Sequence, residues 1–258
     1  MTVSAQSSLA MPQVSMTRPG LQEFEFPEYP GNISVPTMGQ NDVHVWFAYM
    51  CSNPLQQAEY KSLLSRDELD RMARFHFERD RDAFVFAHGF LRSLLAGYLQ
   101  LSPGELRFDY TGYAKPSISQ ITDIQFNLSH TDGAVLLALC RNREIGVDIE
   151  KVRSDFELMS IAARFFTRKE RESLLHLTEP ERAEAFFHCW TRKEAVLKAR
   201  GDGLSFPLDR VEVSVTPEEA IVGVQTGTEE QRWRVMPLNV RAGYVAAVAL
   251  SEHQQTAD

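Results

Sequence analysis

Several common sequence signatures are missing from this chain of 258 residues. It has no Walker A sequence, no GxGxxG and no HExxH, so three frequent phosphate-, dinucleotide- and zinc-binding motifs are excluded. Its three cysteines, Cys51, Cys140 and Cys189, form no CxxC pair. Neither a zinc site nor a disulfide framework is therefore indicated, and we expect buried structural thiols.

Long apolar runs and an excess of positive charge are also missing. No run approaches the roughly 18–20 apolar residues that span a bilayer. The N-terminal residues include neither the positive leader nor the continuous apolar segment of a secretory signal. The net charge is −8, whereas nucleic-acid binding requires a basic surface. The composition, 43% hydrophobic and 24% charged, is typical of a globular protein. We therefore expect a cytoplasmic location and neither a membrane nor a nucleic-acid partner.

Residues 1–42 differ from the remainder of the chain. They contain five prolines that interrupt regular structure, namely Pro12, Pro19, Pro27, Pro30 and Pro36. We predict an irregular N-terminal extension, in which Phe24, Phe26 and Tyr29 either dock on the folded body or remain disordered. From Val43 onward, apolar residues alternate with others, which predicts a strand with one buried face.

Two long helices are predicted by apolar spacing and by their terminal residues. The first covers residues 80–99, and the second runs from Glu179 to Arg200 and ends at Gly201. Three capping boxes pair a hydroxyl with a glutamate three residues later: Ser154 with Glu157, Thr167 with Glu170, and Thr178 with Glu181. Short strands are expected at residues 107–110, 124–128, 134–140, 145–150, 211–215, 233–236 and 244–250. The pair 134–140 and 145–150 resembles a hairpin through Asn142.

The order strand, long helix, strands thus occurs twice. This repetition predicts an α+β protein with two similar lobes, a first at residues 43–150 and a second at residues 151–258.

Asp148 and Glu150 are the first candidates for chemistry. On a strand their carboxylates leave the same face, roughly 6.6 Å apart along the chain. Two hard oxygen ligands on a rigid element suit Mg²⁺, which binds through a few carboxylates and substrate phosphates. The alternative is an ordinary solvent-facing side of a strand.

A third carboxylate lies on the second long helix. Trp190, Glu194 and Lys198 are spaced by four residues and so share one helix face. Taken alone, this stripe is equally a Glu–Lys pair beside a core aromatic. The functional interpretation of this helix face is favoured because Asp148 and Glu150 need a third carboxylate to complete a metal site.

Ser129 and His130 follow a predicted strand, where small polar groups commonly receive ligands. A hydrolase is not indicated, because adjacent residues on an extended chain point apart and no GxSxG elbow is present. His130 is either a phosphate ligand or a turn residue. Five arginines, Arg71, Arg74, Arg79, Arg81 and Arg92, concentrate positive charge and either bind phosphate or form a mixed-charge surface.

These features, in order, resemble a known family. Gly146-Val147-Asp148-Ile149-Glu150, followed by Trp190-x-x-Lys193-Glu194-Ala195-x-x-Lys198, is similar to the paired signatures of the 4'-phosphopantetheinyl transferases of the two-lobed surfactin-synthetase-activating type. Four further segments match that type in order: Arg74-Phe75 with Asp80, Lys115-Pro116, residues 126–130, and residues 201–208. The resemblance covers about residues 43–250.

The resemblance implies two lobes related by pseudo-twofold symmetry, each a small antiparallel sheet packed on a long helix, with coenzyme A in the cleft between them. Mg²⁺ would be held by Asp148, Glu150 and Glu194. Lys198 would contact the pyrophosphate and assist the leaving group, and Glu194 would act as the base for the serine of an acyl or peptidyl carrier protein.

The remaining contacts to coenzyme A follow from the same resemblance. Ser129, His130, Asp148 and Lys198 belong to its binding site, with Arg71 and Arg74 beside the 3'-phosphate and Lys115 and Pro116 beside the adenine. Two positions depart from the family pattern, since Ala114 replaces a common glycine and Ala83 a common basic residue. A monomer is expected, and fatty-acid, polyketide and nonribosomal-peptide carriers all remain open.

Two other activities are compatible with the residues. One is a different Mg²⁺-dependent phosphotransferase, which would need a glycine-rich phosphate loop. The other is a non-catalytic carrier-protein or nucleotide-binding module of the same fold, which would be expected to have lost a carboxylate or Lys198.

Overall fold

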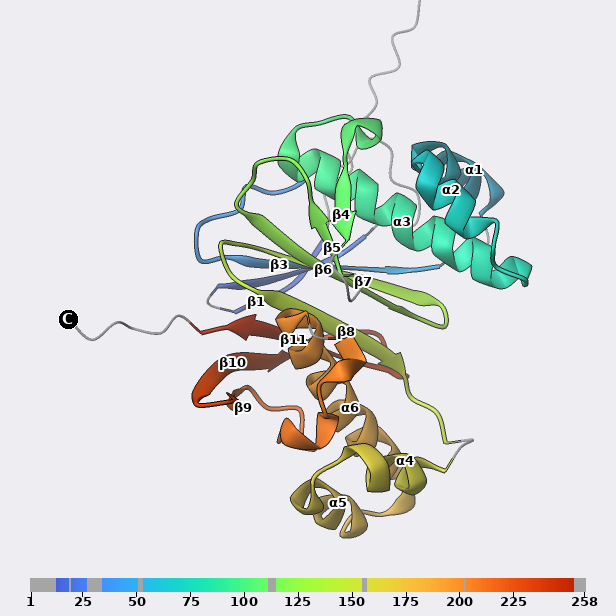
Figure 1. Ribbon diagram of the computed structural model, residues 1–258. Helices are drawn as coiled ribbons and strands as arrows, with labels where there is room; N and C mark the ends of the chain where they lie inside the picture. Colours follow the sequence, from blue (N-terminus) through green and yellow to red (C-terminus); the bar gives the residue numbers. More distant parts are fainter. Residues whose placement is uncertain are drawn as a thin grey trace, which may run out of the picture.

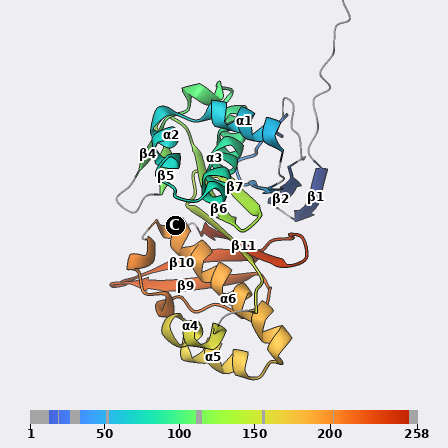
Figure 2. The same cartoon turned by 90° about the vertical axis from the view of Figure 1, so that its right-hand side faces the viewer.

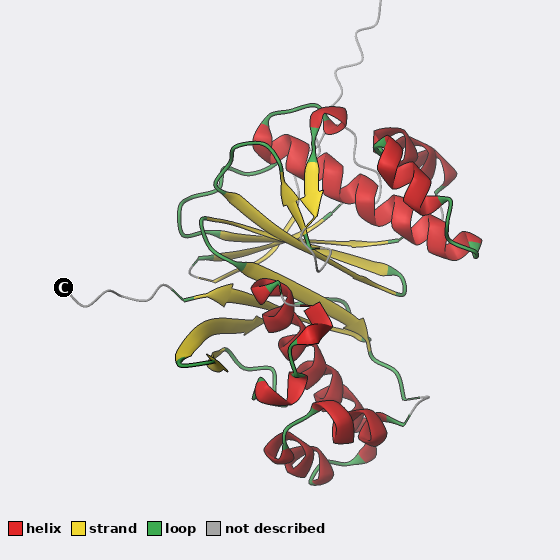
Figure 3. Ribbon diagram, in the orientation of Figure 1, coloured by secondary structure: helices red, strands yellow, loops and turns green. Residues whose placement is uncertain are grey.

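The computed structural model describes residues 13–18, 20–26, 34–50, 53–110, 115–154, 157–201 and 203–252, and their elements form four layers (Figure 1). The long helix α3 (Glu78–Leu99) covers the outer face of one sheet, and α6 (Glu179–Arg200) covers the outer face of the other. The two sheets face each other in the centre, and the helices lie outside (Figure 3). Among the described helices, none is long and apolar enough to cross a membrane.

The first lobe contains a five-stranded sheet of order β1-β2-β3-β7-β6. Its strands are β1 (Gln13–Arg18), β2 (Leu21–Glu25), β3 (Val43–Tyr49), β6 (Ile124–Thr131) and β7 (Ala134–Arg141). The lobe also includes α1 (Pro54–Leu63), α2 (Arg66–Met72), a short turn of helix at Pro103–Glu105, and the strand pair β4 (Phe108–Tyr110) and β5 (Pro116–Ile118).

The second lobe contains a four-stranded sheet of order β8-β11-β10-β9. Its strands are β8 (Ile145–Lys151), β9 (Ala220–Thr226), β10 (Glu229–Pro237) and β11 (Tyr244–Ser251). Two short helices, α4 (Leu158–Phe165) and α5 (Arg168–Leu175), precede α6, and short helical turns at Gly203–Ser205 and Leu208–Arg210 follow it.

The same topology occurs in both lobes. In each lobe a strand, β3 or β8, is followed by two short helices and a helix of 22 residues. Each lobe then ends in two adjacent antiparallel strands, the last of which inserts beside that first strand. In the first lobe β7 pairs antiparallel with both β3 and β6, and in the second β11 pairs antiparallel with both β8 and β10. The predicted pair of similar α+β lobes is therefore confirmed.

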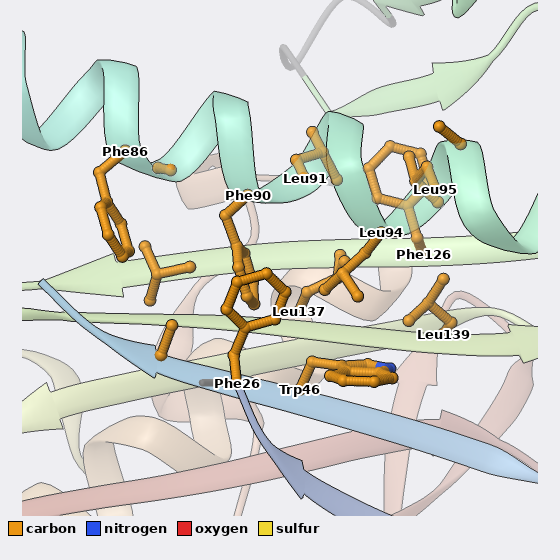
Figure 4. Close-up of a cluster of buried hydrophobic side chains, with 14 of the residues drawn as sticks. Phe26, Trp46, Phe86, Phe90, Leu91, Leu94, Leu95, Phe126, Leu137 and Leu139 are labelled. Atoms are coloured by element: carbon orange, nitrogen blue, oxygen red, sulfur yellow. The ribbon is translucent and has the colours of Figure 1, made fainter. Parts of the chain in front are cut away.

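The core consists of three apolar layers. Between α3 and the first sheet, Phe90 and Leu94 pack toward Leu137 and Trp46 (Figure 4). A second layer lies between α6 and the other sheet, and a third fills the space between the two sheets. Because both faces of β7 are covered, its residues from Ala134 to Cys140 are all buried, which accounts for their uninterrupted apolar sequence.

The N-terminal extension departs from the irregular structure that was predicted for it. Residues 13–18 and 21–25 form β1 and β2, and β2 pairs parallel with β3, so the first sheet is mixed rather than purely antiparallel. Phe24 and Phe26 are buried in the core beneath α3, while Tyr29 lies outside the described residues. In the sequence, Pro12, Pro19 and Pro27 lie before, between and after the two strands and not within them. The number of prolines alone does not show this spacing.

The predicted hairpin of residues 134–140 and 145–150 is wrong. β7 and β8 belong to different sheets, because β8 pairs with β11 from Ile145↔Leu250 to Lys151↔Tyr244. The predicted lobe boundary after residue 150 therefore falls inside a strand of the second sheet. A buried apolar strand fits either sheet, and only long-range pairing decides between them.

Helix limits agree closely with the sequence patterns. α6 has the predicted bounds and ends at Gly201, whose φ of 78° suits glycine. The capping boxes at Thr167 and Thr178 are present, but α4 begins at Leu158 after an N-cap without a side-chain hydrogen bond, so the Ser154 box is wrong. Residues 211–215 form no strand. Cys140 and Cys189 are buried as expected, and Cys51 lies outside the described residues.

Candidate active site

The face of β8 that carries Gly146, Asp148 and Glu150 packs on α6, while Val147 and Ile149 enter the apolar layer between the sheets. A Cβ atom on Gly146 would lie 2.1 Å from the carbonyl oxygen of Ala195 and 2.2 Å from the amide nitrogen of Ala199. Glycine at this position therefore permits the strand and the helix to approach closely enough for their polar side chains to meet.

Asp148 is the centre of a polar cluster drawn from both lobes. Its Oδ1 lies 2.6 Å from Nζ of Lys198 on α6 and accepts a hydrogen bond of 2.9 Å from Oγ of Ser129 on β6. Lys198 Nζ also donates to Ser129 Oγ at 2.8 Å. The second oxygen, Asp148 Oδ2, is buried and has no hydrogen-bond partner among the described residues.

Two glutamates flank this cluster. Glu150 Oε2 accepts a hydrogen bond of 3.1 Å from Thr131 Oγ1, again across the two lobes. Burial and the neighbouring Asp148 raise the pKa of Glu150. Burial, together with Asp148 and Glu150, raises the pKa of Glu194 to about 7. The three carboxylates thus repel one another, and the single ammonium of Lys198 does not balance their charge.

A cavity of about 770 Å³ opens over these residues. Its polar lining comprises Ser129, His130, Asp148, Glu150, Arg164, Glu194, Lys198 and Asp209, and its apolar lining comprises Leu128, Phe165, Trp190, Phe206, Pro207 and Leu208. The predicted face of Trp190, Glu194 and Lys198 therefore borders this cavity together with Asp148, Glu150, Ser129 and His130. Cavities of this size, with a few convergent polar groups, commonly receive small-molecule ligands.

Arg71 and Arg74 do not border the cavity. Arg71, at the end of α2, places its guanidinium 5.6 Å from the ring centre of Phe84, which stacks on His88 at 3.9 Å. Arg74 is exposed in the turn that follows α2. Both arginines occupy the segment before α3.

Lys115 and Pro116 border a second cavity of about 290 Å³ at the other end of β6. β6 and the C-terminal half of α6 form walls of both cavities. The smaller cavity is lined by Ile124 and Ala199, and the larger one by Ser129 and Lys198. Lys115 Nζ donates to the carbonyl oxygens of Ile145 at 3.2 Å and Ala199 at 3.0 Å, and burial lowers its pKa. Ala114 lies outside the described residues.

Within the part of the chain that is described, no group of three His, Cys, Asp or Glu side chains is arranged to hold a metal. Asp148 is held instead by Lys198 and Ser129. The chemistry of the donor set nevertheless fits a hard divalent cation, because three carboxylates line the same cavity, one buried oxygen has no partner among the described residues, and the pKa values of Glu150 and Glu194 are raised.

Several residues of this site were not identified from the sequence. Gly146 was recognised only as part of a signature, although its missing Cβ decides how closely β8 approaches α6. Thr131, Arg164 and Phe165 carry no distinguishing local pattern, and only the packing of β6 and α4 against the second sheet and α6 brings them to the cavity.

Comparisons with known proteins agree with this description. Residues 144–249 match the model of the 4'-phosphopantetheinyl transferase superfamily, and residues 53–142 match that of the 4'-phosphopantetheinyl transferase N-terminal region. The boundary between these matches coincides with the start of β8. A crystal structure of Thermotoga maritima holo-[acyl-carrier-protein] synthase gives a TM-score of 0.31 at 18% identity over 43% of this chain and 64% of that chain, which is too low to support a conclusion.

Two curated relatives cover most of the chain. The 4'-phosphopantetheinyl transferase HetI of Nostoc sp. is 37% identical over 83% of this chain and 90% of its own length. The 4'-phosphopantetheinyl transferase Sfp of Bacillus subtilis is 30% identical over 79% of this chain and 90% of its own length. With its two-lobed fold and a carboxylate cluster between strand and helix, the chain belongs to the 4'-phosphopantetheinyl transferase superfamily.

Proposed function

We propose that this protein binds coenzyme A between its two lobes and transfers the 4'-phosphopantetheine arm to a serine of an apo acyl or peptidyl carrier protein, with release of 3',5'-ADP. The observation that carries this proposal is the meeting of Ser129 from the first lobe with Asp148 and Lys198 from the second, at one end of the large cavity. All of these residues come from one chain, which supports a monomer as the active unit.

The pyrophosphate of coenzyme A is assigned to the polar end of the cavity. Lys198 supplies positive charge there, and its hydrogen bonds to Asp148 and Ser129 orient the ammonium before the substrate arrives. His130, exposed at the end of β6 and bordering the cavity, is assigned to the 3'-phosphate together with Arg71 and Arg74.

The second cavity is assigned to the adenine ring. Pro116 borders it, and the side chain of Lys115 is held at the C-terminus of α6, where a cation is favourable. Since both cavities share walls from β6 and α6, one extended molecule can occupy the two.

In the transfer step, Oγ of the carrier serine attacks the β-phosphorus of coenzyme A. The bond between that phosphorus and the bridging oxygen breaks, and the oxygen leaves with 3',5'-ADP. The serine proton passes to the Glu194 carboxylate, directly or through one water. A pKa of about 7 suits this role, because a general base works best when its pKa is close to the working pH.

Mg²⁺ is assigned to Asp148, Glu150 and Glu194. When bound, it would neutralise charge on the pyrophosphate and on the leaving 3',5'-ADP. Lys198, whose Nζ lies 2.6 Å from Asp148 Oδ1, contributes to the same charge balance. Burial and then the neighbouring carboxylates raise the pKa values of Glu150 and Glu194, and a bound cation would offset both effects, which supports this assignment.

The test is to incubate apo-carrier proteins of fatty-acid, polyketide and nonribosomal-peptide type with coenzyme A, Mg²⁺ and this protein, and to weigh the carriers by mass spectrometry. The carrier should gain one phosphopantetheine arm, and Asp148→Ala should prevent the gain. Glu229→Gln, on an exposed strand end far along the second sheet, serves as the matched control. An unchanged mass for every carrier type would overturn the proposal.

A non-catalytic module of the same fold gives a different result. Such a module would retain coenzyme A in equilibrium dialysis and leave every carrier unmodified. A phosphotransferase acting on another nucleotide would release a product other than 3',5'-ADP, which chromatography of the reaction mixture distinguishes.

A further inference from the structure

The segment Leu21–Glu25 lies outside both regions that match the family models, yet it contacts the second lobe. β2 lies between β1 and β3 in the first sheet, and its alternate residues face different layers. Phe24 enters the apolar layer beneath α3, whereas Leu21 enters the layer between the two sheets. Glu23 shares the face of Leu21, so its carboxylate is directed toward the second lobe.

Glu23 is fully buried, with 0% of its surface exposed, and it is hydrogen-bonded by Asn239 of the opposite lobe. Oε2 accepts a hydrogen bond of 2.7 Å from the Asn239 backbone N–H, and Oε1 accepts one of 2.9 Å from Asn239 Nδ2. Asn239 lies in the connection between β10 and β11. Figure 2 shows β2 beside this connection, at the edge where the two sheets meet.

Neighbouring contacts hold the same connection. Arg241 Nη2 lies 2.5 Å from Glu25 Oε1, and the Arg241 backbone N–H donates to Tyr49 Oη at 2.7 Å. The Arg241 guanidinium also lies 3.9 Å from the ring centre of Tyr49. Residues of β2 and β3 thus fix both ends of the short segment 239–241.

This connection leads directly into the strand that supports the carboxylates. β11 begins at Tyr244, and its register with β8 places Val245 opposite Glu150 and Ala247 opposite Asp148. The partners of those carboxylates, Thr131 and Ser129, belong to the first lobe. The position of β11 relative to the first lobe therefore decides whether the two halves of the site meet.

We propose that Glu23 and Asn239 form an inter-lobe clasp that holds β8 and β11 against β6, so that Glu23 is a positioning residue for the transfer reaction. A buried carboxylate is costly unless it is hydrogen-bonded, and the two bonds from Asn239 to Glu23 form when the lobes are closely apposed. The inference about catalysis rests on the proposed function, whereas the clasp itself does not.

Two amide protons report on the clasp independently of activity. The Val147 N–H donates to Asn127 Oδ1 at 2.8 Å and the Ile149 N–H donates to Ser129 Oγ at 3.4 Å, so both bonds run from the second lobe to the first. Separation of the lobes would release these protons to solvent. Leu137, inside the first sheet and fully buried, provides a reference amide within one lobe.

The experiment compares amide hydrogen exchange by NMR and kcat/KM for transfer in Glu23→Gln, Asn239→Asp and the double variant. Glu23→Gln places an amide N–H₂ against Asn239 Nδ2, and Asn239→Asp places two carboxylates face to face. Each single variant should exchange the Val147 and Ile149 amides at least about tenfold faster, with Leu137 unchanged, and should lose about tenfold in kcat/KM. The double variant restores a donor opposite an acceptor and should recover most of both losses.

Two results would overturn the clasp. One is that the exchange rates of the Val147 and Ile149 amides stay as unchanged as that of Leu137 in every variant. The other is that the double variant exchanges these amides as fast as the faster of the two single variants. Faster exchange without any loss of kcat/KM would overturn the positioning role. Glu229→Gln should alter none of these quantities. If the unsubstituted protein modifies no carrier, the proposed function fails, and the exchange data still decide whether the clasp exists.

Discussion

Gly146 lies against the backbone of Ala195 so closely that no side chain fits between them, because a Cβ atom there would be 2.1 Å from the Ala195 carbonyl oxygen. This contact sets the separation between β8 and α6, and hence the distance of 2.6 Å between Asp148 Oδ1 and Lys198 Nζ. The site depends on a missing Cβ atom as much as on its charged groups.

Gly146→Ala should force β8 away from α6. Overpacking of this kind costs roughly 1–3 kcal/mol of unfolding free energy, and we expect kcat/KM to fall at least about tenfold because Asp148 is displaced from Lys198. Thermal unfolding and steady-state kinetics measure the two effects. Gly104→Ala is the matched control, since a Cβ atom there meets nothing within 4 Å. If Gly146→Ala and Gly104→Ala had the same unfolding free energy and the same kcat/KM, the close contact at Gly146 would not matter for the site.

Glu194 should make the metal-free protein less stable as the pH rises. Burial and neighbouring carboxylates raise its pKa to about 7 in the folded state, from the usual 4.5 of a glutamate. Between these two values the folded chain keeps a proton that the unfolded chain has released, so the free energy of unfolding falls with rising pH.

The measurement compares denaturant unfolding of the wild type and Glu194→Gln in EDTA from pH 4.5 to pH 8. The wild type should lose roughly 1–3 kcal/mol relative to the variant across the lower part of this range, and the difference should level off above about pH 7. A constant difference at every pH would contradict the raised pKa.

Glu194 and His130 should affect different kinetic constants. Glu194→Ala removes the assigned base and should lower kcat by roughly 10²–10⁴. His130→Ala removes an assigned phosphate contact and should raise KM for coenzyme A while leaving kcat within about threefold. Equal loss of kcat in both variants at saturating coenzyme A would show that the role given to His130 is wrong.

Lys193 should be essential for stability, although it is adjacent to Glu194 in the sequence. Its side chain has 0% exposure, its Nζ lies 2.8 Å from Glu170 Oε2, and it donates to the carbonyl oxygen of Leu208, a residue of the cavity wall. Lys193→Met leaves the Glu170 carboxylate buried without its cation, which should cost roughly 3–5 kcal/mol of unfolding free energy.

The control for this prediction is Lys169→Met, which breaks the exposed pair of Lys169 with Glu212 and should cost under about 1 kcal/mol. Chemical denaturation of both variants measures the difference. Losses of similar size would mean that the buried pair contributes no more than a surface one.

Much of the candidate site follows from local sequence. Period-two alternation places Asp148 and Glu150 on one face of a strand, and four-residue spacing places Trp190, Glu194 and Lys198 on one face of a helix, whatever the remainder of the chain does. The limits of α6 follow equally from Thr178, Glu181 and Gly201, because capping is decided by residues within one turn of the helix end.

Tertiary structure alone decided the pairings. The apolar residues 145–149 suit either sheet, and only contact with β11 assigned them to the second, which made the predicted hairpin wrong. The segments of β1 and β2 have weak local signals, and they form strands because β2 pairs with the edge of β3 and β1 pairs with β2. Burial of Glu23 against Asn239, and the meeting of Ser129 with Asp148, join residues far apart in the chain, and no local pattern encodes such distances.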